Sequence, residues 1–392
     1  MKEKGLTVTL HHTSLKATRF RRSVRFVLGT FAACMLPLAT VNATAVAKEA
    51  TAVRTSITEP TQAYLMSFHT CATGATDCNN PSNHIVQLAQ SADAVSWSMV
   101  GGWQSYQGSV PDVFRRGDTI YVYSTSGLLR INIKTGVSTT SSVTLSSGNY
   151  VDPSLAQLPD GRLILFYLPG IMGQDPAGCA PGEASCVRQI KSAVEVAGSD
   201  GTRFTVDNDA RISETITNSF SDPDIFFNGK EWVLYVSRGP SVHAYTSTSL
   251  QGTYVFKSVV SNNIGGVPSG LQLADGSVVT LVHRSMGAAT EIQRATSTLG
   301  DSPISSFQTA LTARSLGLGN YAESPGLALN NAGIACSSCS LSSSVTTTPS
   351  ITTTTTGSGS SKAKSTISCV KGKTAKKVSG VNPKCPAGYK KK

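Results

Sequence analysis

The sequence lacks the short motifs that mark several common enzyme classes. It contains no G-x-S-x-G nucleophile turn, no H-E-x-x-H zinc motif and no glycine-rich phosphate loop. Its cysteines after residue 45 fall into close pairs, so none is expected to be free to act as a nucleophile with a histidine. The sequence therefore does not indicate serine-hydrolase, zinc-protease or nucleotide-dependent chemistry, and we expect neither a metal nor a cofactor.

Acidic residues are absent from the last 36 residues, which hold ten lysines. The net charge of +11 comes from the two ends of the chain, because residues 46–356 carry 17 basic and 22 acidic side chains. This body is mildly acidic and shows no interleaving of aromatic and basic residues. We therefore expect no nucleic-acid partner, despite the basic isoelectric point.

An uncharged run, Phe26–Ala45, follows a basic segment and ends on the small-residue step Ala43-Thr44-Ala45. This order of basic, apolar and small-residue regions predicts a secretory signal peptide over residues 1–45. A membrane anchor is the alternative, but Pro37 and Asn42 interrupt the apolar run. We expect a secreted or cell-surface protein that has no stable transmembrane segment after processing.

The eight remaining cysteines are expected to form disulfides. An even number of cysteines in short local loops is typical of an exported protein. The C-x-x-C form of Cys336 and Cys339 also suits zinc, although no second pair or nearby histidine accompanies it. The expected bridges are Cys71 with Cys78, Cys179 with Cys186, Cys336 with Cys339, and Cys369 with Cys385.

Two C-terminal segments follow the body, which we place at 46–340. Residues 341–361 are rich in serine and threonine and hold too little apolar surface to offset their ordering entropy, so we expect a flexible linker. Residues 362–392 form a Lys-rich tail that is too short for a core and needs its cysteine pair as a staple. The tail either stays solvated or attaches the protein to an anionic polymer of the cell envelope.

Five similar segments recur within the body. Each has a proline, a short apolar strand and a turn rich in glycine, aspartate or asparagine, and all but the last continue into a second strand. The intervals between the prolines are 42, 70, 45 and 57 residues, and a four-stranded propeller blade takes about 40 to 50. The prolines are Pro111, Pro153, Pro223, Pro268 and Pro325.

The two ends of the body complement each other. The first unit lacks a strand led by proline, and the segment at Pro325 lacks outer strands. If residues 322–330 pair with residues 63–69, the ring closes without an unpaired edge. We therefore predict an all-β fold, a five-bladed β-propeller closed by a C-terminal inner strand.

These motifs resemble those of a known group of enzymes. Asp-Pro or Val-Pro-Asp steps before inner strands, Asp-Gly turns and the S-x-D-x-x-x-W pattern of Ser91–Trp97 are similar to those of the five-bladed glycosidases of glycoside hydrolase families 43 and 32. Ser91, Asp93 and Trp97 also look like a degenerate Asp-box of sialidases. The resemblance covers residues 60–340 and implies activity on, or binding of, a carbohydrate or glycoconjugate.

The resemblance implies roles for three carboxyl groups. Glu323, in Glu-Ser-Pro, resembles the catalytic acid, and Asp152, in Asp-Pro, resembles the base that activates water. The family places a further aspartate one blade before the acid, where this chain has Val267-Pro268-Ser269. Asp222 lies elsewhere in the ring and is expected to help hold the sugar.

A geometric argument from the repeats leads to the same region. Inner strands of a small propeller converge on its axis, so polar residues at their starts crowd one mouth of the channel. A simpler interpretation is that these acids only accept backbone hydrogen bonds where each strand begins. The further candidates for sugar binding are Asp112, Asp224, Arg238, His243, His283 and Arg284.

Three functions stay open on the sequence alone. An inverting glycosidase needs paired axial carboxyl groups, one protonated and one ionised. A non-catalytic glycan-binding propeller needs aromatic side chains such as Trp103 and Tyr106 exposed along a groove. An extracellular interaction scaffold needs neither.

Overall fold

The computed structural model describes residues 52–54, 57–170, 186–216, 219–287, 289–336, 365–371, 374–380, 384–386 and 388–391. The expected signal peptide, the expected linker and Cys179 lie outside these ranges. The regular secondary structure of the described residues is almost entirely β, with two short 3-10 helices, Pro81–Asn83 and Ala313–Leu316. Within the described part of the chain, no helix is long and apolar enough to cross a membrane.

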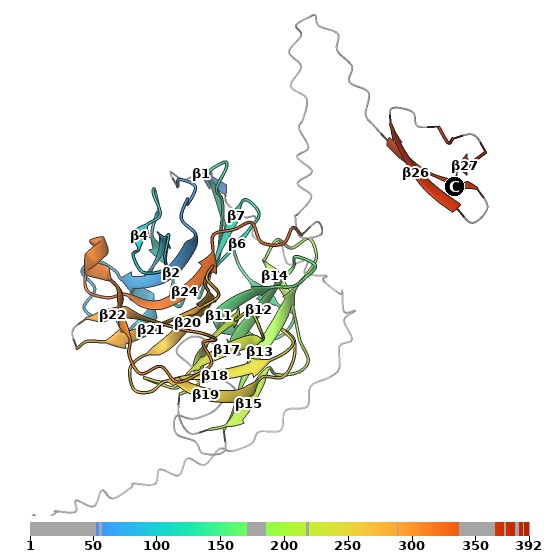
Figure 1. The fold of residues 1–392 in the computed structure, drawn as a ribbon. Helices are drawn as coiled ribbons and strands as arrows, with labels where there is room; N and C mark the ends of the chain where they lie inside the picture. Colours follow the sequence, from blue (N-terminus) through green and yellow to red (C-terminus); the bar gives the residue numbers. More distant parts are fainter. Residues whose placement is uncertain are drawn as a thin grey trace, which may run out of the picture. The chain divides into compact units, whose positions relative to one another are not determined.

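Five sheets surround one axis, and the expected five-bladed β-propeller is confirmed (Figure 1). Their strands pair antiparallel, apart from the parallel pair of β10 and β14. The inner strand of each sheet gives the blade its name here. The inner strands are β6 (Asp112–Arg116), β11 (Tyr150–Gln157), β16 (Ser221–Phe227), β20 (Gly266–Gln272) and β24 (Glu323–Leu329). Each contacts the inner strand of the next blade, and β24 contacts both β20 and β6 to complete the ring.

The other strands follow each inner strand outward in four meanders. The β6 blade continues through β7 (Thr119–Ser124), β8 (Gly127–Asn132) and β9 (Val137–Ser141) to β1 (Ala52–Arg54). The β11 blade continues through β12 (Leu163–Pro169), β13 (Val187–Glu195) and β14 (Arg203–Val206), with β10 (Thr144–Leu145) and β15 (Ile212–Thr215) beside them. The β16 blade adds β17 (Trp232–Ser237), β18 (Val242–Ser247) and β19 (Val255–Ser261), and the β20 blade adds β21 (Val278–Ser285), β22 (Thr290–Ser297) and β23 (Gln308–Thr312).

The last blade is built from both ends of the body, as the repeats predicted. Its inner strand β24 pairs with β2 (Tyr64–Cys71), which is followed by β3 (His84–Ser91), β4 (Ser98–Met99) and β5 (Tyr106–Gln107). The register runs from Tyr64 opposite Leu329 to His69 opposite Glu323. This pairing fastens the ring, and it also decides that His69 lies beside Glu323.

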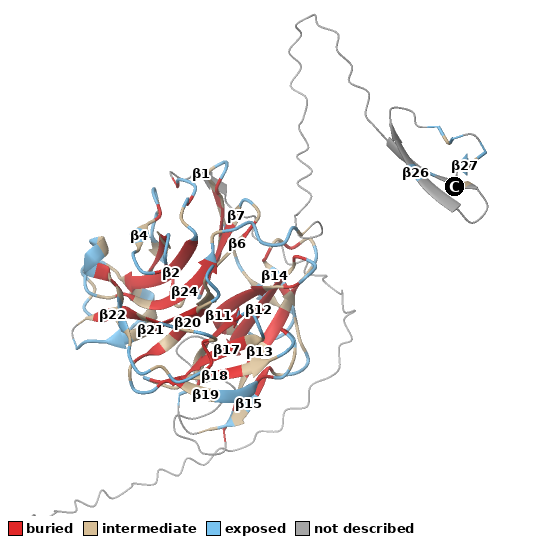
Figure 2. Cartoon of the chain, viewed as in Figure 1, coloured by how far each residue is buried: buried red, intermediate tan, exposed pale blue. Residues whose placement is uncertain are grey.

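The hydrophobic core lies between the blades. The second strands are buried on both faces, because each blade packs between two others, and they therefore read as apolar runs such as Ile120–Tyr123 and Leu163–Leu168. Figure 2 shows the buried residues concentrated in the inner and second strands, and the exposed ones in outer strands and loops. Polar contacts also join blades: Arg116 bonds the fully buried Glu195 at 2.6 Å, and Glu195 accepts the N–H groups of Leu163 and Gly201.

The cysteines agree with the expected oxidised state as far as the structure describes them. Cys71 and Cys78 form a disulfide. Cys186, Cys336 and Cys385 are also disulfide-bonded, although their partners are not among the described side chains, so those three pairings stay predictions. A bonded Cys336 favours the disulfide over the zinc alternative at that position.

The Lys-rich tail forms a small sheet of its own in the described residues. Its strands are β25 (Ser365–Lys371), β26 (Thr374–Gly380) and β27 (Lys390–Lys391), in the order β26-β25-β27. The expected attachment of this tail to an anionic polymer stays a prediction.

Removal of β24 is expected to abolish cooperative unfolding. A chain that ends at residue 318 loses the inner strand of the last blade and leaves the edge of β2 that faces the axis without a partner strand. Thermal unfolding, followed by circular dichroism, should show a broad transition for this chain and one sharp transition for the full-length protein. Equal melting of the two proteins would contradict ring closure by β24.

Peptide mass mapping of the unreduced protein should find each expected cysteine pair linked. The linked peptides should separate when the same digest is reduced. Free thiols or bound zinc in the purified protein would overturn the assignment.

Candidate active site at the axial mouth

The residue before the proline of each inner strand has a left-handed backbone. The φ angles lie between 46° and 52° at Val110, Asp152, Asp222, Val267 and Ser324. This conformation is unfavourable for residues other than glycine, and most of all for β-branched valine. Four of the five inner strands also change register with their neighbour at this step. The recurrent proline motif therefore encodes a repeated bend that brings the strand starts together at the axis.

The five X-Pro steps line a narrow axial cavity of about 20 Å³. Asp152 and Asp222 contribute to its wall, as do Asp112 and Asp224. A volume of this size holds about one water molecule and no sugar ring. A sugar would therefore have to bind above the cavity, at its mouth.

The residue after the proline has a different task in four of the blades. Its side chain accepts a hydrogen bond from a backbone N–H of the next inner strand, and we call these four contacts the inter-blade latches. The latches join Asp112 to Leu155 at 2.7 Å, Ser154 to Ile225 at 3.0 Å, Asp224 to Gly270 at 2.7 Å and Ser269 to Leu327 at 3.0 Å. In the fifth blade this position is Gly326, where a β-carbon would collide with Asp112.

Asp112 and Asp224, which the sequence suggested as sugar ligands, thus lie buried in contacts between blades. Burial raises the pKa of Asp112 well above its usual range, and the charge of Asp224 adds to the effect. Burial also raises the pKa of Asp224, to about 7, although hydrogen bonds from Gly270 and Ser269 oppose the shift. Their first role is to hold neighbouring inner strands together.

Asp152 and Asp222 precede their prolines in adjacent blades and are joined directly. The backbone N–H of Asp222 donates to Asp152 Oδ2 at 3.2 Å, and Ser221 Oγ donates to Asp222 Oδ2 at 2.7 Å. Burial raises the pKa of Asp152 well above its usual range, and the charge of Asp222 raises it further. Burial also raises the pKa of Asp222, and Glu323 adds to the rise while Ser221 and His283 oppose it. Two buried carboxyl groups this close favour retention of a proton by the pair.

Glu323 starts β24 and lies between two histidines. Its Oε2 is 3.4 Å from His69 Nε2, and its Oε1 is 3.5 Å from His283 Nε2. The three side chains are 17%, 4% and 21% exposed, respectively, so Glu323 and His283 can be reached from the mouth. Burial raises the pKa of Glu323, but contacts with His69, His283 and Thr290 together lower it below its usual value. Glu323 is therefore ionised at neutral pH, whereas burial shifts the pKa values of the two aspartates in the opposite direction.

The remaining candidates have contacts in the outer parts of their blades. Arg238 lies in the turn between β17 and β18 and forms an ion pair with Glu214 at 3.3 Å. His243 packs against Phe256. Arg284 is exposed on β21, opposite Glu291 in the strand pairing. His283 is thus the member of this group that contacts a catalytic candidate.

Sequence reasoning missed His69. No motif marks it, since it lies within the apolar strand β2. The predicted pairing of β2 with β24 contained the necessary signal, because the register places His69 opposite Glu323.

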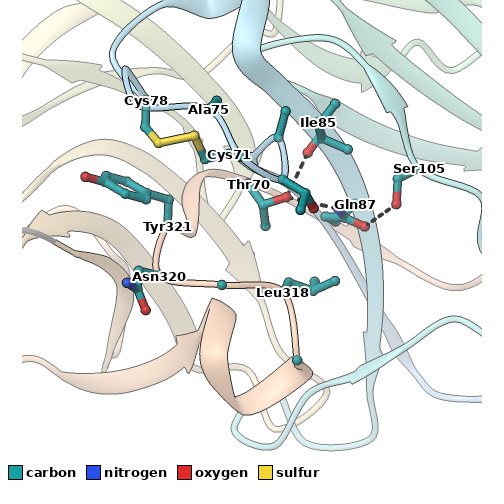
Figure 3. Close-up of a pocket in the computed structure, with 15 residues that line it drawn as sticks. Thr70, Cys71, Ala75, Cys78, Ile85, Gln87, Ser105, Leu318, Asn320 and Tyr321 are labelled. Atoms are coloured by element: carbon teal, nitrogen blue, oxygen red, sulfur yellow. Dashed lines mark hydrogen bonds between the residues drawn. A yellow bond between two sulfur atoms is a disulfide. The ribbon is translucent and has the colours of Figure 1, made fainter.

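A larger cavity of about 780 Å³ lies beside the mouth (Figure 3). The loop of the Cys71–Cys78 disulfide forms one wall, and residues 317–321 form another. Thr70 and Tyr321 line it, and they are one residue from His69 and two residues from Glu323 in the chain. Gln87 donates to Thr70 Oγ1 at 3.0 Å and accepts from Ser105 Oγ at 2.9 Å. The volume and the mixed lining suit a small polar ligand.

Trp103 and Tyr106, the aromatic residues considered for a sugar groove, contribute to packing. Both lie against the hydrophobic cluster between the β24 and β6 blades, and Trp103 Nε1 donates to the carbonyl of Val86. Tyr321 is the aromatic residue that borders the large cavity.

Solved structures of several glycoside hydrolases are similar to this chain at low sequence identity. No protein-family model and no curated protein matches the chain. Among solved structures it is similar to an endo-1,4-β-xylanase from Bacteroides thetaiotaomicron, with 16% identity, a TM-score of 0.45 and coverage of 67% of this chain and 98% of that one. It is also similar to a GH43_1 enzyme from Xanthomonas citri, with 14% identity, a TM-score of 0.43 and coverage of 62% and 87%.

A family 117 glycoside hydrolase from Zobellia galactanivorans is a further structural match. The identity is 17% and the TM-score 0.31, over 40% of this chain and 54% of that one. The chain is a propeller similar to glycoside hydrolases in fold. At these similarities the chemistry has to come from the site itself.

Replacement of Asp224 by asparagine is expected to reduce the pH dependence of stability. The pKa of Asp224 in the folded protein, about 7, lies above the ordinary value of 3.8. Its contribution to the free energy of unfolding is therefore fully present below about pH 4 and is lost as the pH rises through 7. The loss is on the order of 4 kcal/mol by linkage. Urea unfolding at pH 4.5 and pH 8 should therefore show a smaller stability difference for Asp224→Asn than for the wild type.

The exposed Asp275→Asn variant is the matched control, and it should keep the wild-type pH dependence. An unchanged difference in Asp224→Asn would show that the buried aspartate does not titrate in this range.

Proposed function

We propose that this protein is a glycan-processing propeller that hydrolyses glycosidic bonds at the mouth formed by Asp152, Asp222 and Glu323. One observation carries the proposal: three carboxyl groups converge at one end of the axis in environments that shift their pKa values in opposite directions. Glycoside hydrolysis needs such a difference, because one carboxyl group must give a proton while another is ionised.

The environments suggest an exchange of the roles that the sequence resemblance implies. A catalytic acid needs a raised pKa, and the contacts of Glu323 with His69 and His283 lower its pKa instead. The raised pKa values belong to Asp152 and Asp222, and Asp222 is the less buried of the two. We therefore assign the proton donor to Asp222, which Asp152 supports, and the base to Glu323.

In this scheme the proton of Asp222 goes to the oxygen of the leaving sugar. Glu323 accepts a proton from the water that attacks the anomeric carbon, and His283 lies within reach of the same carboxylate. The result is inversion of configuration, provided that the two carboxyl groups lie roughly 6.5 to 9.5 Å apart in the complex. His69 stays neutral and keeps Glu323 ionised.

The sugar at the scissile bond has to bind above the axial cavity, which is too small for it. The large cavity beside the mouth then receives the neighbouring part of the glycan. Tyr321 offers an aromatic face there, and Thr70 and Asn320 offer polar groups (Figure 3). Export by the signal peptide and attachment through the basic tail complete the proposal, since both would place the site outside the cell.

A glycan-binding propeller without hydrolytic activity is the second candidate. It is favoured by Val267-Pro268-Ser269, because the β20 blade supplies no carboxyl group next to Glu323. The lowered pKa of Glu323 also suits a carboxylate that accepts hydrogen bonds from sugar hydroxyls.

Hydrolysis and binding should be measured separately for residues 46–392. Aryl glycosides and polysaccharides provide the panel for hydrolysis, and calorimetry with the same polysaccharides measures binding. Asp222→Asn and Glu323→Gln are each expected to lower kcat by about 10² to 10⁴, with the affinity for the glycan nearly retained, because the loss falls on proton transfer.

The exposed acids Asp275 and Glu59 offer matched controls, as Asp275→Asn and Glu59→Gln should retain full activity. Full activity of Asp222→Asn or Glu323→Gln on a true substrate would contradict the catalytic assignment. Binding without hydrolysis by the wild type, lost in Glu323→Gln, would support the second candidate. NMR of the first product anomer would distinguish inversion from retention.

A further inference from the structure

The hairpin of β2 and β3 places two histidines and a cysteine on one face. His84 lies opposite Cys71 and His69 lies opposite Val86, so the two histidines are diagonal neighbours. Their rings stack with centroids 3.9 Å apart and planes inclined by 12°. His84 is 6% exposed and His69 is 3% exposed, so this stack is inside the protein.

Hydrogen bonds fix the orientation of His84 at both ring nitrogens. Its Nε2 is 2.8 Å from the carbonyl oxygen of Cys78, and its Nδ1 is 2.6 Å from Ser109 Oγ. A carbonyl only accepts, so Nε2 carries the hydrogen and the neutral ring accepts the Ser109 hydroxyl at Nδ1. Ser109 is itself held by Thr125, which exchanges two hydrogen bonds with its backbone.

His69 has fewer restraints of its own. Neither ring nitrogen makes a hydrogen bond of good geometry in the described part of the chain. Its Nε2 faces Glu323 Oε2 at 3.4 Å, and one face of its ring is covered by His84. The stack with His84 is therefore the contact that sets the direction of His69 toward Glu323.

The disulfide restrains the loop that lies at the other end of this series of side-chain contacts. Cys71 and Cys78 close a short loop, and Cys78 supplies the carbonyl that His84 needs. Ala72 bonds Asn83 across the base of the same loop. The loop also forms a wall of the large cavity beside the mouth.

We propose that His84, held by Ser109 and the Cys71–Cys78 loop, is a positioning residue that keeps His69 neutral and directed at the Glu323 carboxylate. The loop that shapes the glycan cavity thus also maintains the ionised base, through contacts from Cys78 to His84 to His69 to Glu323. This inference rests on the proposed function only in naming Glu323 as the catalytic base, because the contacts and protonation states do not require a substrate.

The electrostatic surroundings of His69 agree with this geometry. Burial lowers the pKa of His69 to about 4, and a positive charge on either His84 or His283 would act in the same direction. Glu323 opposes the shift through its contact and its charge. These three groups, from β3, β21 and β24, are the titratable side chains that act on His69.

Side-chain NMR of protein labelled with ¹⁵N-histidine tests the proposal without a substrate. In the wild type, His69 should stay neutral as the Nε2–H tautomer down to about pH 4, and His84 should show the same tautomer. Ser109→Ala removes one hydrogen bond to His84, and the Cys71→Ala, Cys78→Ala double variant releases the loop. Each should move the midpoint of the His69 titration by at least one pH unit or change its tautomer.

His243→Gln serves as the control, because His243 packs against Phe256 in the β16 blade and should leave the His69 signals unchanged. A wild-type His69 that titrates near 6.5, or a His69 titration that is unchanged in both variants, would overturn the proposal. If the double variant fails to fold, Ser109→Ala alone decides. A negative glycan screen would contradict the proposed function and leave this result intact.

Discussion

The bend before each inner-strand proline is the constraint on which the rest of the structure depends. Five residues take an unfavourable left-handed backbone there, including two valines. Such strain persists only where the surroundings hold it, and here the inter-blade latches lie one residue after each of four prolines. The bend and the latch together bring five strand starts to one axis. Because the same step repeats in every blade, any polar residue at this position is drawn into the mouth.

Position relative to the proline separates acids that look alike in the sequence. Asp222 and Asp224 flank Pro223, yet Asp222 meets Asp152 while Asp224 bonds the backbone of the next blade. Asp112 follows its proline and behaves like Asp224. A carboxyl group before the proline can face the mouth, whereas a carboxyl group after the proline accepts a hydrogen bond from the next blade. The carboxyl groups after the prolines therefore stabilise the scaffold that positions those before the prolines.

The groups around each acid at the mouth determine in which direction its pKa is shifted. Burial raises the pKa values of Asp152 and Asp222, and the charge of Asp222 raises that of Asp152 further. Glu323 has histidines on two sides, which favours the ionised form. These three side chains come from two blades, since Glu323 on β24 and His69 on β2 belong to the last blade and His283 lies on β21 of the β20 blade. Closure of the ring is therefore also the step that assembles the electrostatics of the site.

The sequence by itself determined the architecture and the regions of the chain that form the axis. The spacing of five prolines, the missing inner strand of the first unit and the surplus strand at Glu323 were sufficient for a closed five-bladed ring, because strand patterns and turn residues are local signals. Local signals also placed Asp152, Asp222 and Glu323 at strand starts. Only the tertiary structure decided which acids have raised pKa values, which form latches between blades and which one lies beside histidines. The pKa of a carboxyl group depends on burial and on charges from other blades, and His69, His84 and Glu323 meet only after residues more than 200 positions apart have paired.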